Sequence, residues 1–154
     1  SYGESAGASA SLWLATIDDQ ADPNSKDPVL RESSRLTAAG GFWVQATFDV
    51  IQWPKILGLP EDKTPYWGMV KSSKAQLGEK RFNELRKDMD MLGNMDKNDP
   101  PMHFSPGKEG QGVHSQRFVD VLEKRAKEAG ANLIIKDGRE SLMQFLTGKL
   151  NAKK

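Results

Sequence analysis

The segment 103–117, HFSPGKEGQGVHSQR, gathers the residue types that most often do chemistry, and it leads into an expected helix. Two imidazoles that titrate near neutral pH are the groups that metal-independent cleavage of a phosphodiester uses as acid and base. His103 and His114 are therefore the candidate catalytic residues of a small nuclease or nuclease-type toxin.

A phosphate group would find counter-charges in the same segment. Free backbone N–H groups and the helix dipole favour an anion at a helix start, and the candidate phosphate-binding residues there are Lys108, Ser115 and Arg117. The glycine spacing in this segment matches neither the P-loop nor the dinucleotide-binding pattern. We expect no Gly-x-Ser-x-Gly elbow and therefore no serine nucleophile of that type. The histidines and acids match no recurring ligand spacing. The sequence therefore predicts no metal site and no cofactor.

Large aromatic residues gather in a different part of the chain. Trp43, Trp53, Tyr66 and Trp67 lie within 25 residues that are otherwise poor in regular pattern. Rings of this size either fill a domain's own core or anchor a partner, since Trp and Tyr are common interface residues. We consider these four as candidate partner-docking residues, with the core as the alternative.

The elements that would position these groups are clearest near the end of the chain. Apolar residues at helical spacing predict a helix over 115–129, with Gly130 as its stop, followed by a short buried strand over 131–136. Asp137, with Glu140 three residues later, has the capping-box spacing for a last helix through residue 150.

The earlier elements are less regular. A helix is expected over 28–39, opened by Asp27 and Pro28, and an amphipathic helix over 73–92. Alternation over 42–51 predicts a strand, although the same residues also make a helical stripe. The proline- and glycine-rich residues 95–111 are expected to form a long loop.

These elements indicate an α+β fold: a helix-rich single domain with a small sheet and a C-terminal helix-strand-helix unit. Residues 1–11 are small and polar and lack the large apolar side chains that offset ordering entropy, so we expect residues 1–27 to be a flexible arm and loop. Residues 28–154 would then form the single globular domain, at a length that can bury a sizeable core.

Composition excludes several classes of protein. The chain of 154 residues has no cysteine, which excludes disulfides, thiolate metal sites and cysteine nucleophiles. A net charge of +1 does not favour a protein that coats nucleic acid by charge alone. No apolar run suits a signal peptide or a membrane span. We expect a cytoplasmic protein, or one inside an intracellularly assembled particle.

One short segment of the chain, residues 27–36, suggests a setting for the protein. The string DPVLRESSRL over residues 27–36 resembles a segment of large phage-encoded virion-associated proteins. The resemblance covers ten residues, so no fold and no site residue is carried over from it.

The function predicted from the sequence is a non-enzymatic interaction or structural component of a larger protein assembly, with a phage virion as one setting. The expected partners are other protein subunits, including further copies of this chain, and neither a membrane nor nucleic acid is favoured. The alternative is the small metal-independent nuclease built on the loop 103–117.

Overall fold

The computed structural model describes residues 1–110 and 112–152, and one parallel sheet of four short strands lies at its centre. The strands are β1 (Tyr2–Glu4), β2 (Ala39–Phe42), β3 (Met102–Phe104) and β4 (Leu133–Ile135). Each strand pairs with the next one along the chain, so their order in the sheet is their order in the sequence. Because all four run in the same direction, their carboxyl ends meet at one edge of the sheet.

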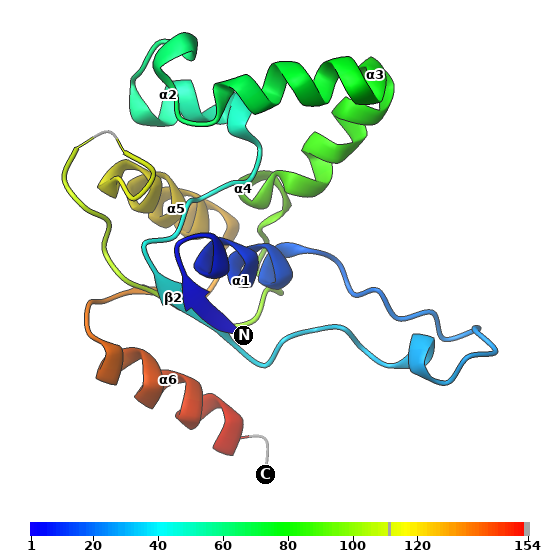
Figure 1. Cartoon of the computed structure of the whole chain (residues 1–154). Coiled ribbons are helices and arrows are strands. Elements are labelled where there is room, and N and C mark those ends of the chain that lie inside the picture. Colours follow the sequence, from blue (N-terminus) through cyan, green and yellow to red (C-terminus); the bar gives the residue numbers. More distant parts are fainter. Residues whose placement is uncertain (111, 153–154) are drawn as a thin grey trace.

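Helices cover both faces of the sheet (Figure 1). They are α1 (Ala6–Thr16), α2 (Trp53–Leu57), α3 (Trp67–Met89), α4 (Met91–Asn94), α5 (Gln116–Ala129) and α6 (Arg139–Asn151), with single 3-10 turns at Val29–Arg31, Val50–Gln52 and Glu61–Lys63. Helices α1 and α5 pack on one face, while α6 returns across the other. The domain is thus a mixed helix-and-strand structure, as expected, and its sheet is entirely parallel.

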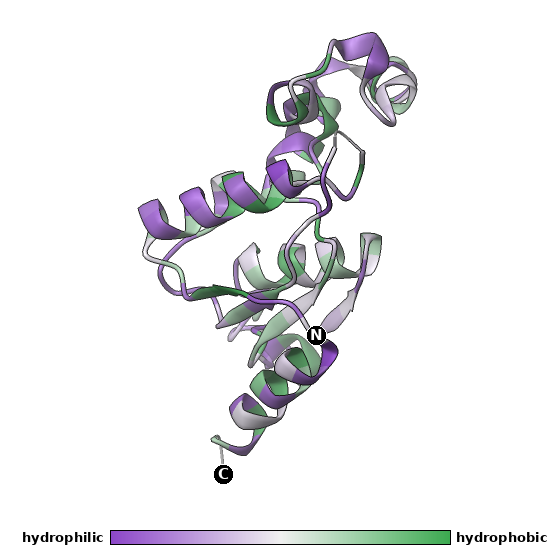
Figure 2. Cartoon of the chain, turned by 90° about the vertical axis from the view of Figure 1, so that its left-hand side faces the viewer, coloured by the Kyte–Doolittle hydropathy of each residue, from purple (hydrophilic) through white to green (hydrophobic). Residues whose placement is uncertain are grey.

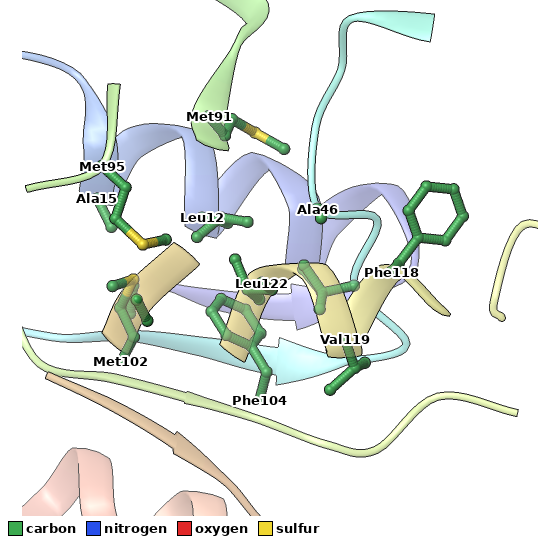
Figure 3. Packing of buried hydrophobic residues seen from close by; sticks show 14 of the residues in the cluster. Leu12, Ala15, Ala46, Met91, Met95, Met102, Phe104, Phe118, Val119 and Leu122 are labelled. Atoms are coloured by element: carbon green, nitrogen blue, oxygen red, sulfur yellow. The ribbon is translucent and has the colours of Figure 1, made fainter. Parts of the chain in front are cut away.

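The main core lies between the sheet and the helices α1 and α5 (Figure 3). Leu12 of α1, Met102 and Phe104 of β3, and Phe118 and Leu122 of α5 are fully buried there. A smaller cluster on the opposite face joins Ala38 to Leu142 and Leu146 of α6. Both clusters stabilise the sheet, which in turn fixes the loops at its carboxyl edge.

Helix α5 forms where the sequence predicts it. Ser115 is its N-cap, with the Ser115 Oγ accepting the Arg117 N–H, and Gly130 ends it in a left-handed conformation with φ 72°. Hydrophobic and hydrophilic residues occupy opposite sides of its ribbon (Figure 2). The strand predicted after it is confirmed as β4, and the last helix is confirmed as α6. Gly138 occupies the N-cap of α6, where no side chain provides a cap bond, so the predicted Asp137 capping box does not form.

The first residues differ from the prediction. Residues 2–16 are β1 and α1 rather than a flexible arm, and Ala8, Leu12 and Ala15 have no exposed surface. Their small side chains let α1 lie close against the sheet, so the composition that suggested disorder serves close packing instead. Residues beyond Thr16 do form a long loop, which extends away from the domain (Figure 1).

Three other predicted segments differ from the structure. The helix expected over 28–39 is reduced to the single turn Val29–Arg31. The strand expected over 42–51 stops at Phe42, because Trp43 adopts a positive φ of 58° that turns the chain out of the sheet. The loop expected over 95–111 contains the central strand β3.

Helix α3 confirms a helix in the region predicted over 73–92, although it runs from Trp67 to Met89. Gly78, with φ 71°, bends it (Figure 1). Arg86 of α3 contacts the buried Asp49 at 3.0 Å, which ties the helix to the loop after β2. None of the helices within the described residues has the length and apolar character needed to cross a membrane.

Candidate active site

Ser5 occupies the sharp turn between β1 and α1. Its backbone has φ 51° and ψ −118°, a conformation that L-residues other than glycine adopt only at a cost of about 1–3 kcal/mol. The Ser5 N–H donates to the Phe42 carbonyl at 2.9 Å, which holds the turn against β2. The strained turn presents the Ser5 hydroxyl above the carboxyl edge of the sheet.

Two glycines, Gly3 before the turn and Gly41 on the neighbouring strand, allow the backbone to pack closely around the start of α1. A Cβ added to Gly3 would lie 2.6 Å from the carbonyl carbon of Gly7, closer than real contacts allow. Gly41 on β2 is restricted in the same way, because a Cβ there would lie 2.6 Å from the Cβ of Ala8. Residues 3–7, GESAG, therefore have the Gly-x-Ser-x-Gly spacing of a nucleophile elbow, together with its strand-turn-helix context.

His114 provides a base for this serine. Its Nε2 lies 2.9 Å from the Ser5 Oγ, although 109 positions separate the two residues. A hydroxyl at this distance from an unprotonated imidazole nitrogen can donate its proton to that nitrogen as the oxygen attacks an electrophile. The pair thus has the geometry of a nucleophile and its general base.

Backbone contacts fix the loop that carries His114. The Lys108 N–H donates to the His114 carbonyl at 2.7 Å, and the Gln116 N–H donates to the Lys108 carbonyl at 2.7 Å. The Ser115 hydroxyl donates to the Gly110 carbonyl at 2.5 Å. These bonds join the two ends of the loop immediately beside the imidazole.

Gln45 connects this loop to the serine helix. Its Nε2 donates to the Val113 carbonyl at 2.9 Å and to the Trp43 carbonyl at 3.1 Å. Its Oε1 accepts the hydroxyl of Ser9 of α1 at 2.7 Å. The side chain is buried, so one amide spans the distance between the residue that precedes His114 and the helix that follows Ser5.

Trp43 contacts the imidazole ring of His114. The ring centroids lie 5.7 Å apart at an angle of 33°, and the Lys108 Nζ lies 4.3 Å from the centroid of the indole ring. The indole therefore contacts both the His114 ring and the Lys108 ammonium, and it limits the rotation of the imidazole.

The start of α1 offers hydrogen-bond donors to a developing oxyanion. The first N–H groups of a helix have no intrahelical acceptor, and the Ala6 N–H immediately follows Ser5. In a nucleophile elbow the N–H after the serine is one of the oxyanion donors. The Ala6 N–H, at the free start of α1, is thus the candidate donor next to the Ser5–His114 pair.

Within residues 1–110 and 112–152, no Asp or Glu carboxylate forms an ion pair with His114. The ring is oriented instead by the indole of Trp43 and by the loop contacts. The same part of the chain contains no group of three or more His, Asp or Glu residues that could hold a metal ion. The described side chains thus bring Ser5 and His114 together as a pair, without a carboxylate ion pair to the imidazole.

The predicted pairing of His103 with His114 does not occur. His103 lies on β3 and is buried against α6, where its Nε2 lies 3.0 Å from the Ser141 Oγ and its ring packs on Phe145. Burial lowers the pKa of His103, and its Nδ1 has no partner among the described residues. The two imidazoles therefore have separate surroundings, and only His114 faces the carboxyl edge of the sheet.

The candidate phosphate-binding residues make contacts within the protein instead. Arg117 donates to the Leu57 carbonyl and so connects α5 to the end of α2. Ser115 is buried as the cap of α5, and Lys108 lies over Trp43. The helix start that they surround belongs to α5, while the free helix start beside His114 belongs to α1.

The four aromatic candidates for docking have different roles. Trp53 is a core residue, 4% exposed, with its Nε1 donating to the Thr47 carbonyl at 2.9 Å. Trp43 is half-buried beside His114, and Trp67 is half-buried at the start of α3. Tyr66 alone is largely exposed, at 55%, and its ring packs edge-on against Trp53.

The candidate Ser5 was not predicted, and the expectation that the chain has no Gly-x-Ser-x-Gly elbow is wrong, because residues 3–7 have that spacing. Its signal was present in the chain as the GESAG spacing, which a search for short catalytic motifs would find. His114 was identified from residue type alone, with another partner. The two residues could be paired only in three dimensions, because the spacing between them follows no local rule.

No protein-family model and no curated protein matches the chain. Among solved structures, it is similar to an acetyl ester-xyloside bifunctional hydrolase from Caldicellulosiruptor lactoaceticus, with a TM-score of 0.57 and 21% sequence identity. The match covers 87% of this chain and 43% of that protein. The chain therefore shares the fold of part of that hydrolase and spans less than half of its length.

Proposed function

We propose that this chain carries the nucleophile and the general base of a serine hydrolase of the α/β-hydrolase type, acting on carboxylic esters. The observation that carries the proposal is the strained Ser5 turn with its Oγ 2.9 Å from His114 Nε2. The parallel sheet supports it, because the nucleophile follows a strand and begins a helix. The likeness of fold to an ester hydrolase agrees with the proposal.

The proposed reaction has two half-reactions. Ser5 Oγ attacks the ester carbonyl carbon while its proton passes to His114 Nε2, and the Ala6 N–H donates to the oxyanion that forms. The tetrahedral intermediate then collapses, and His114 gives the proton to the oxygen of the leaving alcohol. In the second half-reaction His114 takes a proton from water, whose oxygen attacks the acyl-enzyme. The acid departs, and the proton returns to Ser5.

Steady-state hydrolysis of p-nitrophenyl acetate tests the proposal. We expect the intact chain to release p-nitrophenol, and Ser5→Ala or His114→Asn each to lower kcat at least about a thousandfold. Ser33→Ala is the matched control, since Ser33 is an exposed serine on the loop beyond α1. Turnover by folded Ser5→Ala at the rate of the unaltered chain would overturn the proposal, as would a folded chain that hydrolyses no ester.

The prediction of a protein-assembly component, with other copies of the chain as partners or a virion as its setting, stays a prediction. Light scattering of the purified protein would give its oligomeric mass. The nuclease alternative is not favoured, because His103 and His114 have separate surroundings.

A further inference from the structure

A pocket opens directly beside the candidate nucleophile. Ser5 and Ala6 form one side of it, and its volume is about 390 Å³. A cavity of about 150 Å³ with apolar walls is enough to bind benzene. The pocket beside Ser5 thus has room for a group considerably larger than a methyl.

The walls of this pocket are apolar. Besides Ser5 and Ala6, they are formed mainly by Phe48, Val50, Trp53, Met69, Met89 and Val113, together with the ring of Tyr66. No Asp, Glu, Lys or Arg side chain lines it among the described residues. Gln45 also contributes to the wall, but its amide is engaged by Val113, Trp43 and Ser9. The pocket therefore favours a hydrocarbon group over a sugar or a charged group.

The geometry of the reaction decides which side of an ester faces this pocket. His114 must give its proton to the leaving oxygen, so the alcohol lies on the side of the imidazole. Ser5 and Ala6 line the pocket, whereas His114 does not. The carbonyl carbon bonds to Ser5 Oγ, and the substituent that points away from His114 is the acyl chain.

We propose that the pocket formed by α1, α3 and the segment 45–53 binds the acyl chain of the ester, and that the preferred acyl groups are apolar and longer than acetyl. This inference rests on the proposed function. It adds a substrate class to that function: esters of medium-chain or aromatic carboxylic acids.

A series of p-nitrophenyl esters with a constant leaving group tests the inference. Each methylene that leaves water for an apolar wall should raise kcat/KM by about fourfold. We expect acetate, butyrate and hexanoate to be hydrolysed with rising kcat/KM, and benzoate to be accepted as well.

Two matched methionine variants test whether the preference for longer acyl chains depends on this pocket. Met69 lines the pocket and is 62% exposed, so Met69→Asp should fold and should lower the hexanoate-to-acetate ratio of kcat/KM about tenfold. Met143 lies on α6 and is 41% exposed, so Met143→Asp is the control and should leave the ratio as it is.

The two proposals fail in different ways. If no ester is hydrolysed and Ser5 is unreactive, the proposed function is wrong and the inference falls with it. If acetate is hydrolysed through Ser5 but kcat/KM does not rise with acyl length, only the inference is overturned. A preference that follows the alcohol in a series of acetate esters would also overturn it.

Discussion

The Oγ of Ser5 and the Nε2 of His114 lie 2.9 Å apart, brought together by the loops that follow two strands of one parallel sheet. Ser5 follows the end of β1, and His114 belongs to the loop that follows β3. β2 lies between these strands and contributes Trp43 and Gln45 just beyond its own end. The candidate site thus forms because the strands are parallel, so that the loops after β1, β2 and β3 all lie at the same edge of the sheet.

Because Gly3 lies close to the backbone of Gly7, a methyl group at Gly3 should destabilise the fold. Gly3→Ala should lower the free energy of unfolding by about 1–3 kcal/mol, because the new Cβ would overlap the Gly7 backbone. Gly68→Ala is the control: Gly68 lies in α3 with open space around it, so alanine should leave stability unchanged or raise it by up to about 1 kcal/mol. Urea denaturation of the variants measures both effects. Equal stability of the two would contradict the packing argument.

The strained backbone of Ser5 should lower the stability of the folded chain, and a glycine at this position should relieve that strain. Ser5→Gly should be more stable than Ser5→Ala by about 1–2 kcal/mol, because glycine adopts a φ of 51° without a steric penalty. Both variants should lack esterase activity. Thermal denaturation of the two proteins tests the prediction, and an alanine variant as stable as the glycine variant would argue that Ser5 is unstrained.

The side-chain amide of Gln45 should position His114 for catalysis by holding the residue that precedes it. Gln45→Leu removes the bonds to the Val113 and Trp43 carbonyls, so the base should be less well placed and kcat should fall about tenfold to a hundredfold with little change in KM. Gln144→Leu is the control, since Gln144 is an exposed glutamine on α6. A change in KM alone would assign Gln45 to substrate binding. An unaltered kcat in the folded variant would remove it from the site.

Asp99 is buried and lies away from the candidate site, and its pKa predicts that the stability of the fold depends on pH. Burial raises the pKa of Asp99 from 3.8 to about 6, despite the Asp96 N–H that donates to its carboxylate. Between these values the folded chain binds a proton that the unfolded chain has lost. The contribution of Asp99 to stability is therefore present below about pH 4 and is lost as pH rises through about 6.

Asp99→Asn removes this titration. The variant should match the unaltered chain near pH 4 and exceed it by about 1–3 kcal/mol at pH 7. Thermal denaturation across this range, taken as the difference between the two proteins, isolates the Asp99 contribution. A difference that does not vary with pH would show that the pKa of Asp99 is the same in the folded and unfolded chains.

The elements governed by local rules could be predicted from the sequence. Helix α5 has a strong apolar stripe, a serine cap and a terminal glycine, and its limits are close to the predicted ones. The strand and helix that follow it were likewise predictable. Each of these depends on residues a few positions apart, so one sequence is sufficient.

The elements governed by contacts distant in sequence were not predictable in the same way. Composition suggests a flexible arm and loop for residues 1–27, yet Ala8, Leu12 and Ala15 of α1 are fully buried against the sheet. β3 interrupts a proline-rich loop, and its strand conformation depends on pairing with β2 and β4. The Ser5 to His114 contact belongs to this second group, although the GESAG spacing was a local signal of it.

The measurement that tests the account most directly is covalent labelling of the folded chain with a fluorophosphonate, followed by mass mapping of the modified peptide. The account predicts one phosphonyl group on Ser5, with loss of ester hydrolysis in proportion to labelling. It also predicts labelling at least about a hundredfold slower in His114→Asn. A folded chain whose Ser5 stays unmodified while other serines react, or that reacts equally fast without His114, would contradict the proposed nucleophile and base.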